Sequence, residues 1–279
     1  MNMYEDLTLD QERALYGIED AVVKSCLFDG PADGESALKE TRRLTIDNCD
    51  FHLRYPMWHM DNSTLNNCRM TDTCRAALWY DRNTQIHNCH LGGIKALREC
   101  DHTLITHTTM ESTEFGWYCR DLQIENSRLV SEYPFLNSSN MVFDHFTMQG
   151  KYSFQYCTDT VIRNSHLKTK DAFWHSKNIR VEDSVIEGEY LGWYSENLHL
   201  ICCKIVGTQP LCYCKNLILE DCEMVDADLC FERSNVQATV RGHIISVKNP
   251  LPGSAIAADT IGEIILEKGY ENCLISTKT

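Results

Sequence analysis

Four acid–base side chains stand close together in the second half of the sequence, and their types suit carbohydrate chemistry. They are Lys170, Asp171, His175 and Glu189. Glycoside hydrolysis needs two carboxylates about 5–9.5 Å apart, a condition that Asp171 and Glu189 would meet on neighbouring coils of a repeat fold. Lys170 with His175 or Tyr194 would instead supply the base and the cation that a polysaccharide lyase needs. These four residues are the predicted catalytic set if the protein is an enzyme, which the sequence leaves open.

Aromatic and charged residues accompany this set at matching positions of the repeat described below. Rings and charged groups on one surface would suit sugar rings or their carboxylates. The predicted ligand-binding strip consists of Glu132, Lys151, Tyr156, Trp174, Trp193, Tyr194 and Tyr213. The alternative for its charged members is an exposed ladder of ion pairs, each worth a few tenths of a kcal/mol.

These residues can lie on one surface if the fold repeats at a constant interval along the chain. The sequence contains such a repeat, 19 residues long. In each repeat an apolar residue is followed three positions later by an anchor, usually Cys, Ser or Thr, and two positions after that by another apolar residue. Ile124-Glu-Asn-Ser127-Arg-Leu129 is one example, and from Cys89 to Cys222 the anchor returns every 19 residues. The anchors are Cys26, Cys49, Cys68, Cys89, Thr108, Ser127, Phe146, Ser165, Ser184, Cys203 and Cys222. This regularity predicts stacked coils that bury their faces against one another.

The residue before the anchor is the expected site of a sharp bend. The alternation of apolar residues slips by one position there, so the chain must turn. Asn and Asp tolerate the left-handed backbone conformation that such a turn needs. Asn amides stacked about 4.8 Å apart can also hydrogen-bond from coil to coil. The asparagines at this position are Asn48, Asn67, Asn88, Asn126 and Asn164.

The segment eight to eleven positions after the anchor is typical of a third strand. It reads Phe173-Trp174-His175-Ser176 in one coil and Gly192-Trp193-Tyr194-Ser195 in the next. Because its last position is mostly Cys or Ser, we expect that position to face inward together with the tryptophan position. His175 and Tyr194 would then face outward.

These elements predict an all-β fold, a single-stranded right-handed parallel β-helix of about 12 coils with Asn, Cys and Ser ladders. A left-handed β-helix is disfavoured because its unit is six residues long and 19 is not a multiple of six. Leucine-rich repeats share part of the phrase, but their return segment is helical or irregular. The expected divisions are an N-terminal cap at 1–22, the helix at 23–243, and closing strands and a tail at 244–279. A Gly/Pro/Asp-rich loop is expected at 29–40 and a closing strand at 261–267.

Composition narrows the possible partners and the location. A formal net charge of −14 disfavours nucleic acid as a partner, and no apolar run is long enough for a membrane span. The fifteen cysteines include no C-x2-C pair, so we expect buried free thiols rather than a metal site, and we predict no cofactor. The N-terminal residues lack the pattern of a secretion signal. A thiol-rich chain of this kind is expected in the reducing cytoplasm.

Several strings of the sequence are distinctive when set side by side. They are Gly-Ile-Lys-Ala-Leu-Arg-Glu-Cys (93–100), Gly-Lys-Tyr-Ser-Phe-Gln-Tyr (150–156), Thr-Lys-Asp-Ala-Phe-Trp-His-Ser (169–176), Gly-Glu-Tyr-Leu-Gly-Trp-Tyr-Ser (188–195) and Gly-Thr-Gln-Pro-Leu-Cys-Tyr-Cys-Lys-Asn-Leu (207–217). These strings resemble an uncharacterised bacterial family known only as a domain of unknown function. The resemblance implies a right-handed β-helix of the pectate-lyase-like kind, with no established activity or catalytic residues.

Two functions remain open at this point. The first is binding or processing of a carbohydrate, an acidic sugar or a glycan, on the aromatic and charged strip. The second is a non-enzymatic scaffold or protein-interaction module that uses the same strip as an interface, with a homo-oligomer as one form of it.

Overall fold

The computed structural model describes residues 2–30 and 35–277. Within these residues it contains strands and turns but no helix, and so no helix there could span a membrane. The chain divides into two compact units, Met1–Val142 and Phe143–Thr279, which are described separately. The loop expected at 29–40 lies partly outside the described residues.

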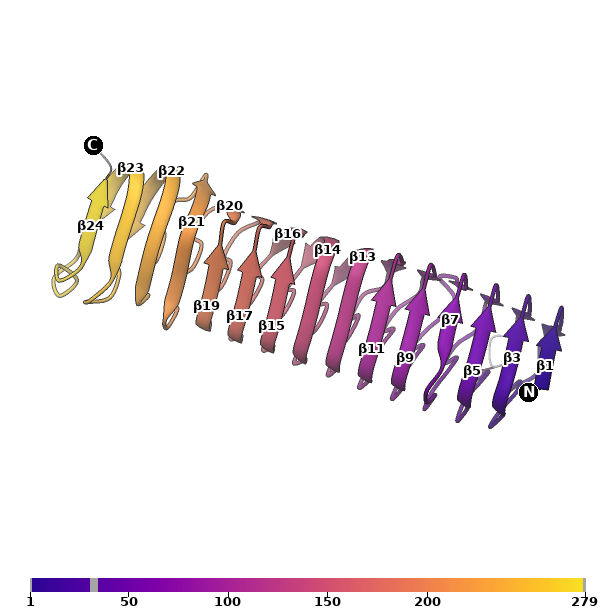
Figure 1. Ribbon diagram of the computed structural model, residues 1–279. Helices are drawn as coiled ribbons and strands as arrows, with labels where there is room; N and C mark the ends of the chain where they lie inside the picture. Colours follow the sequence, from indigo (N-terminus) through magenta and orange to yellow (C-terminus); the bar gives the residue numbers. More distant parts are fainter. Residues whose placement is uncertain (1, 31–34, 278–279) are drawn as a thin grey trace. The chain divides into compact units, whose positions relative to one another are not determined.

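Unit 1 is a stack of coils in which every pair of neighbouring strands runs parallel. Figure 1 shows its long strands as successive arrows, each in register with the strand of the next coil, as in Ile86 opposite Ile105 and Ile105 opposite Ile124. The long strands are β1 (Asn2–Glu5), β3 (Glu19–Lys24), β5 (Arg42–Asp47), β7 (Thr64–Asn66), β9 (Arg82–His87), β11 (Asp101–Thr106) and β13 (Arg120–Glu132). The short strands are β2 (Thr8–Leu9), β4 (Leu27–Phe28), β6 (Asp50–Phe51), β8 (Arg69–Met70), β10 (His90–Leu91) and β12 (Thr109–Glu111).

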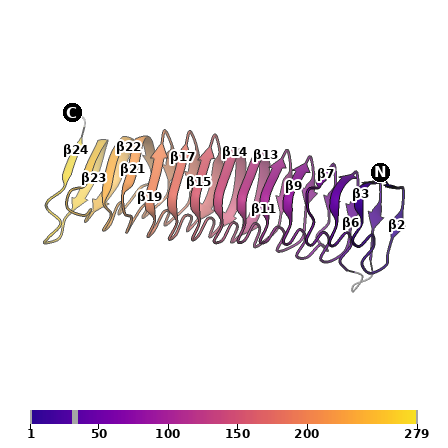
Figure 2. The same ribbon diagram turned by 60° about the horizontal axis from the view of Figure 1, so that its bottom comes forward.

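Unit 2 repeats the arrangement, and Figure 2 shows its strands with the connecting turns at their ends. Strand β14 (Ser139–Lys151) contains the boundary between the units. The remaining strands are β15 (Thr158–Arg163), β16 (His166–Lys170), β17 (Lys177–Glu182), β18 (Val185–Glu187), β19 (Glu196–Ile201), β20 (Lys204–Val206), β21 (Leu217–Val225), β22 (Val236–Lys248), β23 (Ala255–Ile265) and β24 (Leu274–Thr277). Their parallel register confirms the predicted parallel β-solenoid. The right-handed coil remains a prediction.

Coil pairing extends into both segments that were expected to be caps. At the start of the chain, β1 pairs in parallel with β3, from Asn2 opposite Ala21 to Glu5 opposite Lys24. At the end, β23 pairs with β22 over its length and β24 pairs with the first four residues of β23. Strand β23 includes Ile261–Ile265 of the closing strand expected at 261–267.

The anchor residue joins one coil to the next through its side chain. The Thr108 N–H donates to Ser127 Oγ at 3.0 Å, and Ser127 Oγ in turn donates to the Glu125 carbonyl at 2.7 Å. In the same way the Cys26 N–H donates to Cys49 Sγ at 3.4 Å. A small side chain with one donor and one acceptor therefore satisfies two backbone groups that the bend leaves without strand partners. All cysteines except Cys202 and Cys273 are buried.

Two ladders of asparagine and aspartate run along the coils. The predicted one precedes the anchor: Asn88 Nδ2 donates to Asn67 Oδ1 at 2.7 Å, and both residues have a positive φ. The second lies thirteen positions after the anchor and was not predicted. There Asn197 Nδ2 donates to Asn178 Oδ1 at 2.8 Å and Asn216 Nδ2 donates to Asn197 Oδ1 at 3.1 Å, again with positive φ. Each coil therefore has two bends of this type.

The third segment of each coil is a turn, and its prediction as a strand was wrong. Its φ angles are positive at alternate residues, as at Asp171 (54°), Phe173 (62°) and His175 (54°), which no β-strand allows. Phe173 is buried and His175 is exposed, but Trp174 is only partly buried and lies at the surface. The tryptophan position therefore does not follow the inward Cys/Ser position, because an alternating left-handed backbone does not alternate side chains as a strand does.

Glycine is required where a turn of one coil lies against the backbone of the coil before it. Gly188 has a φ of +147°, and a Cβ placed on it would lie 1.7 Å from the Thr169 carbonyl oxygen. Gly253 also has a positive φ, +84°, but a Cβ there would meet nothing within 4 Å.

Replacing Gly188 with Ala should therefore cost more stability than the backbone conformation alone would explain. We expect G188A to lower the free energy of unfolding by about 3 kcal/mol or more, because coils must separate to admit the methyl group. Chemical denaturation measures this. The matched control is G253A, in which the left-handed conformation alone should lower the free energy of unfolding, by about 1–2 kcal/mol. Equal losses in the two variants would contradict the close approach.

One carboxyl group is enclosed among the coils of unit 1. Asp81 is 0 % exposed; its Oδ1 accepts the Met60 N–H at 2.8 Å, as the Ser138 hydroxyl accepts the Cys119 N–H at the equivalent place. Within residues 2–30 and 35–277, its Oδ2 has no hydrogen-bond partner. Burial raises the pKa of Asp81 well above its ordinary value of 3.8, because the charged form would lose its hydration.

Asp81→Asn should stabilise the protein at neutral and alkaline pH. In the wild type the unfolded chain releases the Asp81 proton above pH 3.8 while the folded chain retains it, so the unfolding free energy falls as pH rises. The amide keeps the bond from Met60 and cannot ionise, so we expect a gain of roughly 1–3 kcal/mol at pH 8. The gain should vanish near pH 4. Chemical denaturation at a series of pH values measures this, with Asp72→Asn, at an exposed aspartate, as the control. The same dependence of unfolding free energy on pH in both variants would contradict the prediction.

Candidate functional site

The predicted catalytic residues lie in unit 2, and the structure brings part of the set together. Lys170 Nζ lies 3.0 Å from Glu189 Oε2 and 5.1 Å from the centre of the Tyr190 ring. Asp171 is buried, and burial raises the pKa of its carboxyl group, opposed by the Lys170 charge. Its N–H donates to the Glu189 carbonyl at 3.0 Å. Lys170 and Glu189 therefore form an ion pair at the surface, and Asp171 adjoins them through its backbone while its side chain is buried. A catalytic role for these residues remains a prediction.

His175 belongs to a stack of rings rather than to this charged group. Its ring lies 5.1 Å from that of Tyr156 and 5.0 Å from that of Tyr194, nearly parallel to both, and Tyr194 lies 4.9 Å from Tyr213. Both faces of His175 and of Tyr194 are therefore covered by neighbouring rings. A sugar that stacks on an aromatic side chain needs a free face, so these inner rings can offer only their edges.

The tryptophans of the strip bind the coils to one another. Trp174 and Trp193 are stacked with their centres 5.6 Å apart. Trp174 Nε1 donates to the Tyr190 carbonyl and Trp193 Nε1 to the Gln209 carbonyl, each at 2.8 Å. The indole N–H groups thus satisfy turn carbonyls of the next coil.

The two charged residues of the predicted ligand-binding strip lie at the ends of strands, and Lys151 is in register with Lys170 of the next coil. Lys151 Nζ lies 5.6 Å from the centre of the Tyr152 ring, at the end of β14. Glu132, the last residue of β13, belongs to unit 1, whereas the other members of the strip belong to unit 2. A binding role for the strip remains a prediction.

Unit 1 contains a groove of about 580 Å3 that the sequence had not indicated. Its lining consists of rows with one residue from each coil. Most of the lining residues are polar, and Leu104, Leu122 and Val142 are apolar. The row at the second Asn ladder contains Asn62, Asn83, His102, Asp121 and Asn140, and the row two residues later contains Thr64, Gln85, Leu104, Gln123 and Val142. The long strands fix these rows because their residues are in register.

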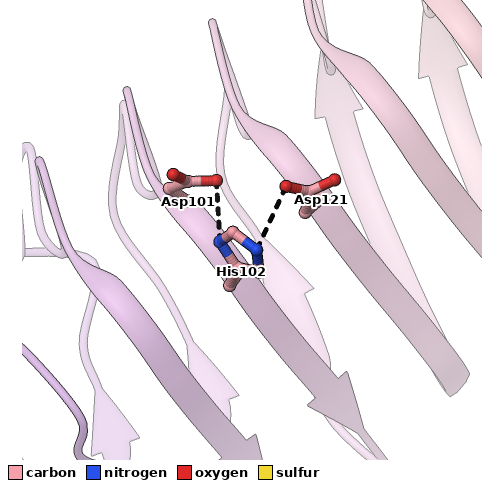
Figure 3. Close-up of side chains that lie close together, drawn as sticks. All are labelled: Asp101, His102 and Asp121. Atoms are coloured by element: carbon pink, nitrogen blue, oxygen red, sulfur yellow. Dashed lines mark ion pairs between the residues drawn. The ribbon is translucent and has the colours of Figure 1, made fainter.

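Figure 3 shows His102 between two aspartates, Asp101 and Asp121. His102 and Asp121 also line the groove. His102 Nδ1 is 3.0 Å from Asp101 Oδ1, and His102 Nε2 is 3.4 Å from Asp121 Oδ2. Arg120 Nε lies 3.1 Å from Asp101 Oδ1 and 3.6 Å from Asp121 Oδ2. The hydrogen bond from Arg120 holds the pKa of Asp101 below its ordinary value. Asn140 donates to the other oxygen of Asp121.

These three residues are also the ones in this region that could hold a metal ion. One ligand atom from each of Asp101, His102 and Asp121 lies within 4.8 Å of the other two. However, Arg120 already contacts both carboxylates, so its cationic group supplies the charge that a metal ion would bring. The arrangement is that of a charge-compensated network with hydrogen-bonding edges toward solvent.

A second hollow, of about 600 Å3, adjoins this network and shares Asp101 and Arg120 with it. Its other lining residues are Arg82, Arg98, Glu99, Cys100 and Tyr118. The Arg98 guanidinium lies 5.1 Å from the Trp79 ring and 5.4 Å from the Trp117 ring. Arg98 occupies a tryptophan position of the repeat, and the two rings hold its planar group in place.

Sequence reasoning missed this region because it followed the aromatic segment. Two signals were present in the sequence. Seven positions before the next anchor, acid and base alternate over successive coils as Asp61, Arg82, Asp101 and Arg120. At the next position His102 and Asp121 interrupt a run of asparagines. A residue that departs from its ladder in this way marks a local change in the surface.

The comparisons with known proteins identify a family. Residues 2–276 match the family model described as "Protein of unknown function (DUF3737)". The chain belongs to this family. No curated protein sequence matches it.

Solved structures similar to this DUF3737 chain include three carbohydrate-active proteins. The mannuronan C-5 epimerase AlgE6 A-module of Azotobacter vinelandii is 7 % identical with a TM-score of 0.44, over 99 % of this chain and 88 % of that one. The catalytic domain of a GH87 α-1,3-glucanase is 9 % identical with a TM-score of 0.42, over 98 % and 62 %. The polygalacturonase of Erwinia carotovora is 8 % identical with a TM-score of 0.33, over 100 % and 96 %. Likeness at this level does not identify a ligand, so the function proposed below rests on residues of this chain.

The charge network predicts a measurable change in one titration. Arg120→Gln should raise the pKa of Asp101 toward its ordinary value, because the hydrogen bond that stabilises the carboxylate is removed. In the wild type this bond stabilises the fold above the ordinary pKa of Asp101 and is lost as pH falls through the lowered value. Carbon NMR of labelled aspartate measures the pKa. Arg163→Gln, which removes a partner of Asp144, is the control, and an unchanged Asp101 in R120Q would contradict the network.

Proposed function

We propose that the groove of unit 1 binds an oligosaccharide that lies across the coils, with about one sugar for each coil. The observation that carries this proposal is the composition of the groove: amide, hydroxyl, imidazole and carboxylate groups in rows that repeat from strand to strand. Planar amides and carboxylates can bind neighbouring sugar hydroxyls with two hydrogen bonds at once.

The spacing of the rows supports an extended chain of sugars. Adjacent strands lie about 4.8 Å apart, which is close to the length of one pyranose unit in an extended chain. A polymer lying across the strands would therefore present equivalent hydroxyl groups to equivalent residues in successive coils. A ligand without such a repeat would use only one coil of the groove.

Several groups in the groove are available to a ligand. Gln85 is exposed, and neither Gln85 nor Thr64 makes a side-chain hydrogen bond within the part of the chain that the structure describes. Leu104 lies in register between Gln85 and Gln123 and is partly exposed. An amide, an apolar side chain and a second amide in sequence match a sugar, which has polar hydroxyls at its edge and C–H groups on its face.

The same features disfavour two other classes of ligand. A nucleic acid would meet the carboxylates of Asp101 and Asp121 in a chain with a net charge of −14. A peptide that adds to a sheet needs an open strand edge, whereas β7, β9 and β11 are paired on both sides.

Binding rather than catalysis is proposed for this groove. A carboxylic general acid needs a raised pKa, and Arg120 lowers that of Asp101. The raised pKa of Asp171 leaves a lyase-like or hydrolase-like activity of unit 2 as a separate hypothesis. The cytoplasmic location also remains a prediction.

The scaffold hypothesis is favoured by one observation in unit 2. The edges of Tyr156 and Tyr194 are exposed, 51 % and 47 %, and Tyr is a residue type that is enriched at protein interfaces. Light scattering tests whether this surface joins two copies of the chain. A monomer at all concentrations would remove the homo-oligomer from consideration.

A binding test with paired variants separates the groove from the strip. We expect calorimetric titration with a series of four- to six-residue oligosaccharides to find a ligand whose affinity falls about five- to tenfold in Gln85→Ala, because one or two hydrogen bonds are lost. The control Gln149→Ala removes an exposed glutamine of β14 and should bind as the wild type does. If affinity falls instead in Lys170→Ala or His175→Ala, the site is the strip, and the proposal for the groove is wrong.

A further inference from the structure

The charged residues beside the groove in unit 1 alternate in sign along one row. In register along the coils stand Glu19, Arg42, Asp61, Arg82, Asp101 and Arg120, three anions and three cations. However, Arg120 pairs with Asp101 and contacts Asp121, and Glu19 pairs with Arg43. The number of charges in the row therefore does not decide which arginine has a carboxylate partner.

Among the residues that the structure describes, Arg82 has no ion-pair partner, although both neighbours in its row are aspartates. Asp61 accepts the amides of Asn62 at 2.9 Å and Asn83 at 3.2 Å. Asp101 is occupied by Arg120 and His102. Within residues 2–30 and 35–277, the Arg82 side chain makes no ion pair and no hydrogen bond. Arg82 is exposed, so its five N–H donors are available to a ligand.

The hollow around Arg82 has more cationic than anionic side chains in its lining. Three arginines line it, Arg82, Arg98 and Arg120, against two carboxylates, Glu99 and Asp101. Tyr118, which is 41 % exposed, lines it as well. Arg98 lies between the rings of Trp79 and Trp117, so it is held in position before a ligand arrives. Its own carboxylate contact, to Glu99, is long at 3.7 Å. The hollow is thus a locally cationic place in an acidic protein.

We propose that this hollow is an oxyanion subsite in which Arg82, assisted by Arg98, binds an acidic group carried by the oligosaccharide in the groove. The planar guanidinium fits a carboxylate with two parallel hydrogen bonds, so a hexuronic acid unit is the ligand that the geometry favours. This inference rests on the proposed function, since Asp101 and Arg120 line both the hollow and the central network. It adds a preference for acidic over neutral sugars that the groove alone would not have.

The test compares oligosaccharides that differ only in charge. Calorimetric titration is performed with hexuronic acid oligomers, with the same oligomers after reduction of their carboxyl groups to neutral alcohols, and with sulfated neutral oligomers. We expect an acidic series to bind about tenfold or more tightly than the neutral one, with an advantage that shrinks as salt concentration rises. The acidic series that binds more tightly identifies the group as a carboxylate or a sulfate ester.

Variants of two arginines in the same row assign the preference to the hollow. Arg82→Gln should abolish the preference for the acidic series while leaving the affinity for the neutral series unchanged. Arg42→Gln removes an exposed arginine from the same row outside the hollow and should retain the preference. A thermal melt of each variant confirms that it is folded.

The possible failures are distinguishable. Equal binding of acidic and neutral oligomers, unaffected by R82Q, would overturn the oxyanion subsite and leave the proposed groove intact. Preference lost equally in R82Q and R42Q would also overturn it, because the effect would then be one of general charge. If no oligosaccharide binds at all, the proposed function is wrong and this inference is wrong with it.

Discussion

The structure depends on how the backbone is hydrogen-bonded at the bends between strands. A parallel coil can pair its strands with the next coil, but a sharp bend takes some N–H and carbonyl groups out of that pairing, and an unpaired buried group is costly. The anchor side chain repairs this: Ser127 Oγ accepts the Thr108 N–H and donates to the Glu125 carbonyl. The same need explains the Asn ladders, whose residues adopt the left-handed conformation and bond between coils.

The need for side chains to bond these backbone groups also explains residues that are unusual at their position in the repeat. Asp81 receives the Met60 N–H as Ser138 receives that of Cys119, at the price of a buried carboxyl oxygen without a partner. The tryptophans perform a related task in the turn segment, where Trp193 Nε1 satisfies the Gln209 carbonyl. Polar and aromatic residues whose types suggest catalysis or binding are thus often hydrogen-bonded to the backbone of a neighbouring coil.

Stacking in register has a consequence for function. Equivalent side chains lie about 4.8 Å apart, so rings in a column cover one another's faces, as the ring of His175 is covered by those of Tyr156 and Tyr194. Short polar side chains in a column retain free edges, as Gln85 does. In this fold a ligand therefore finds hydrogen-bonding groups more easily on Asn, Gln and Thr rows than on aromatic rows. Where one residue differs from the others in its row, as His102 does among asparagines, the surface offers different hydrogen-bonding groups. Under the proposed function, such positions distinguish one ligand from another.

The parallel β-solenoid, its inward columns and the ladder before each anchor followed from the sequence alone, because a 19-residue period with Cys, Ser or Thr at one point and Asn before it leaves few other solutions. Periodicity is a property of the chain itself, and neighbouring coils repeat the same contacts. The turn in the third segment did not follow, because Phe173-Trp174-His175 has the composition of a strand while its left-handed residues carry no glycine signal. Nor did the position of the groove, since Asp101, His102 and Asp121 are unremarkable within one coil. Their network, and the missing partner of Arg82, arise only when coils are stacked and several side chains compete for the same carboxylates.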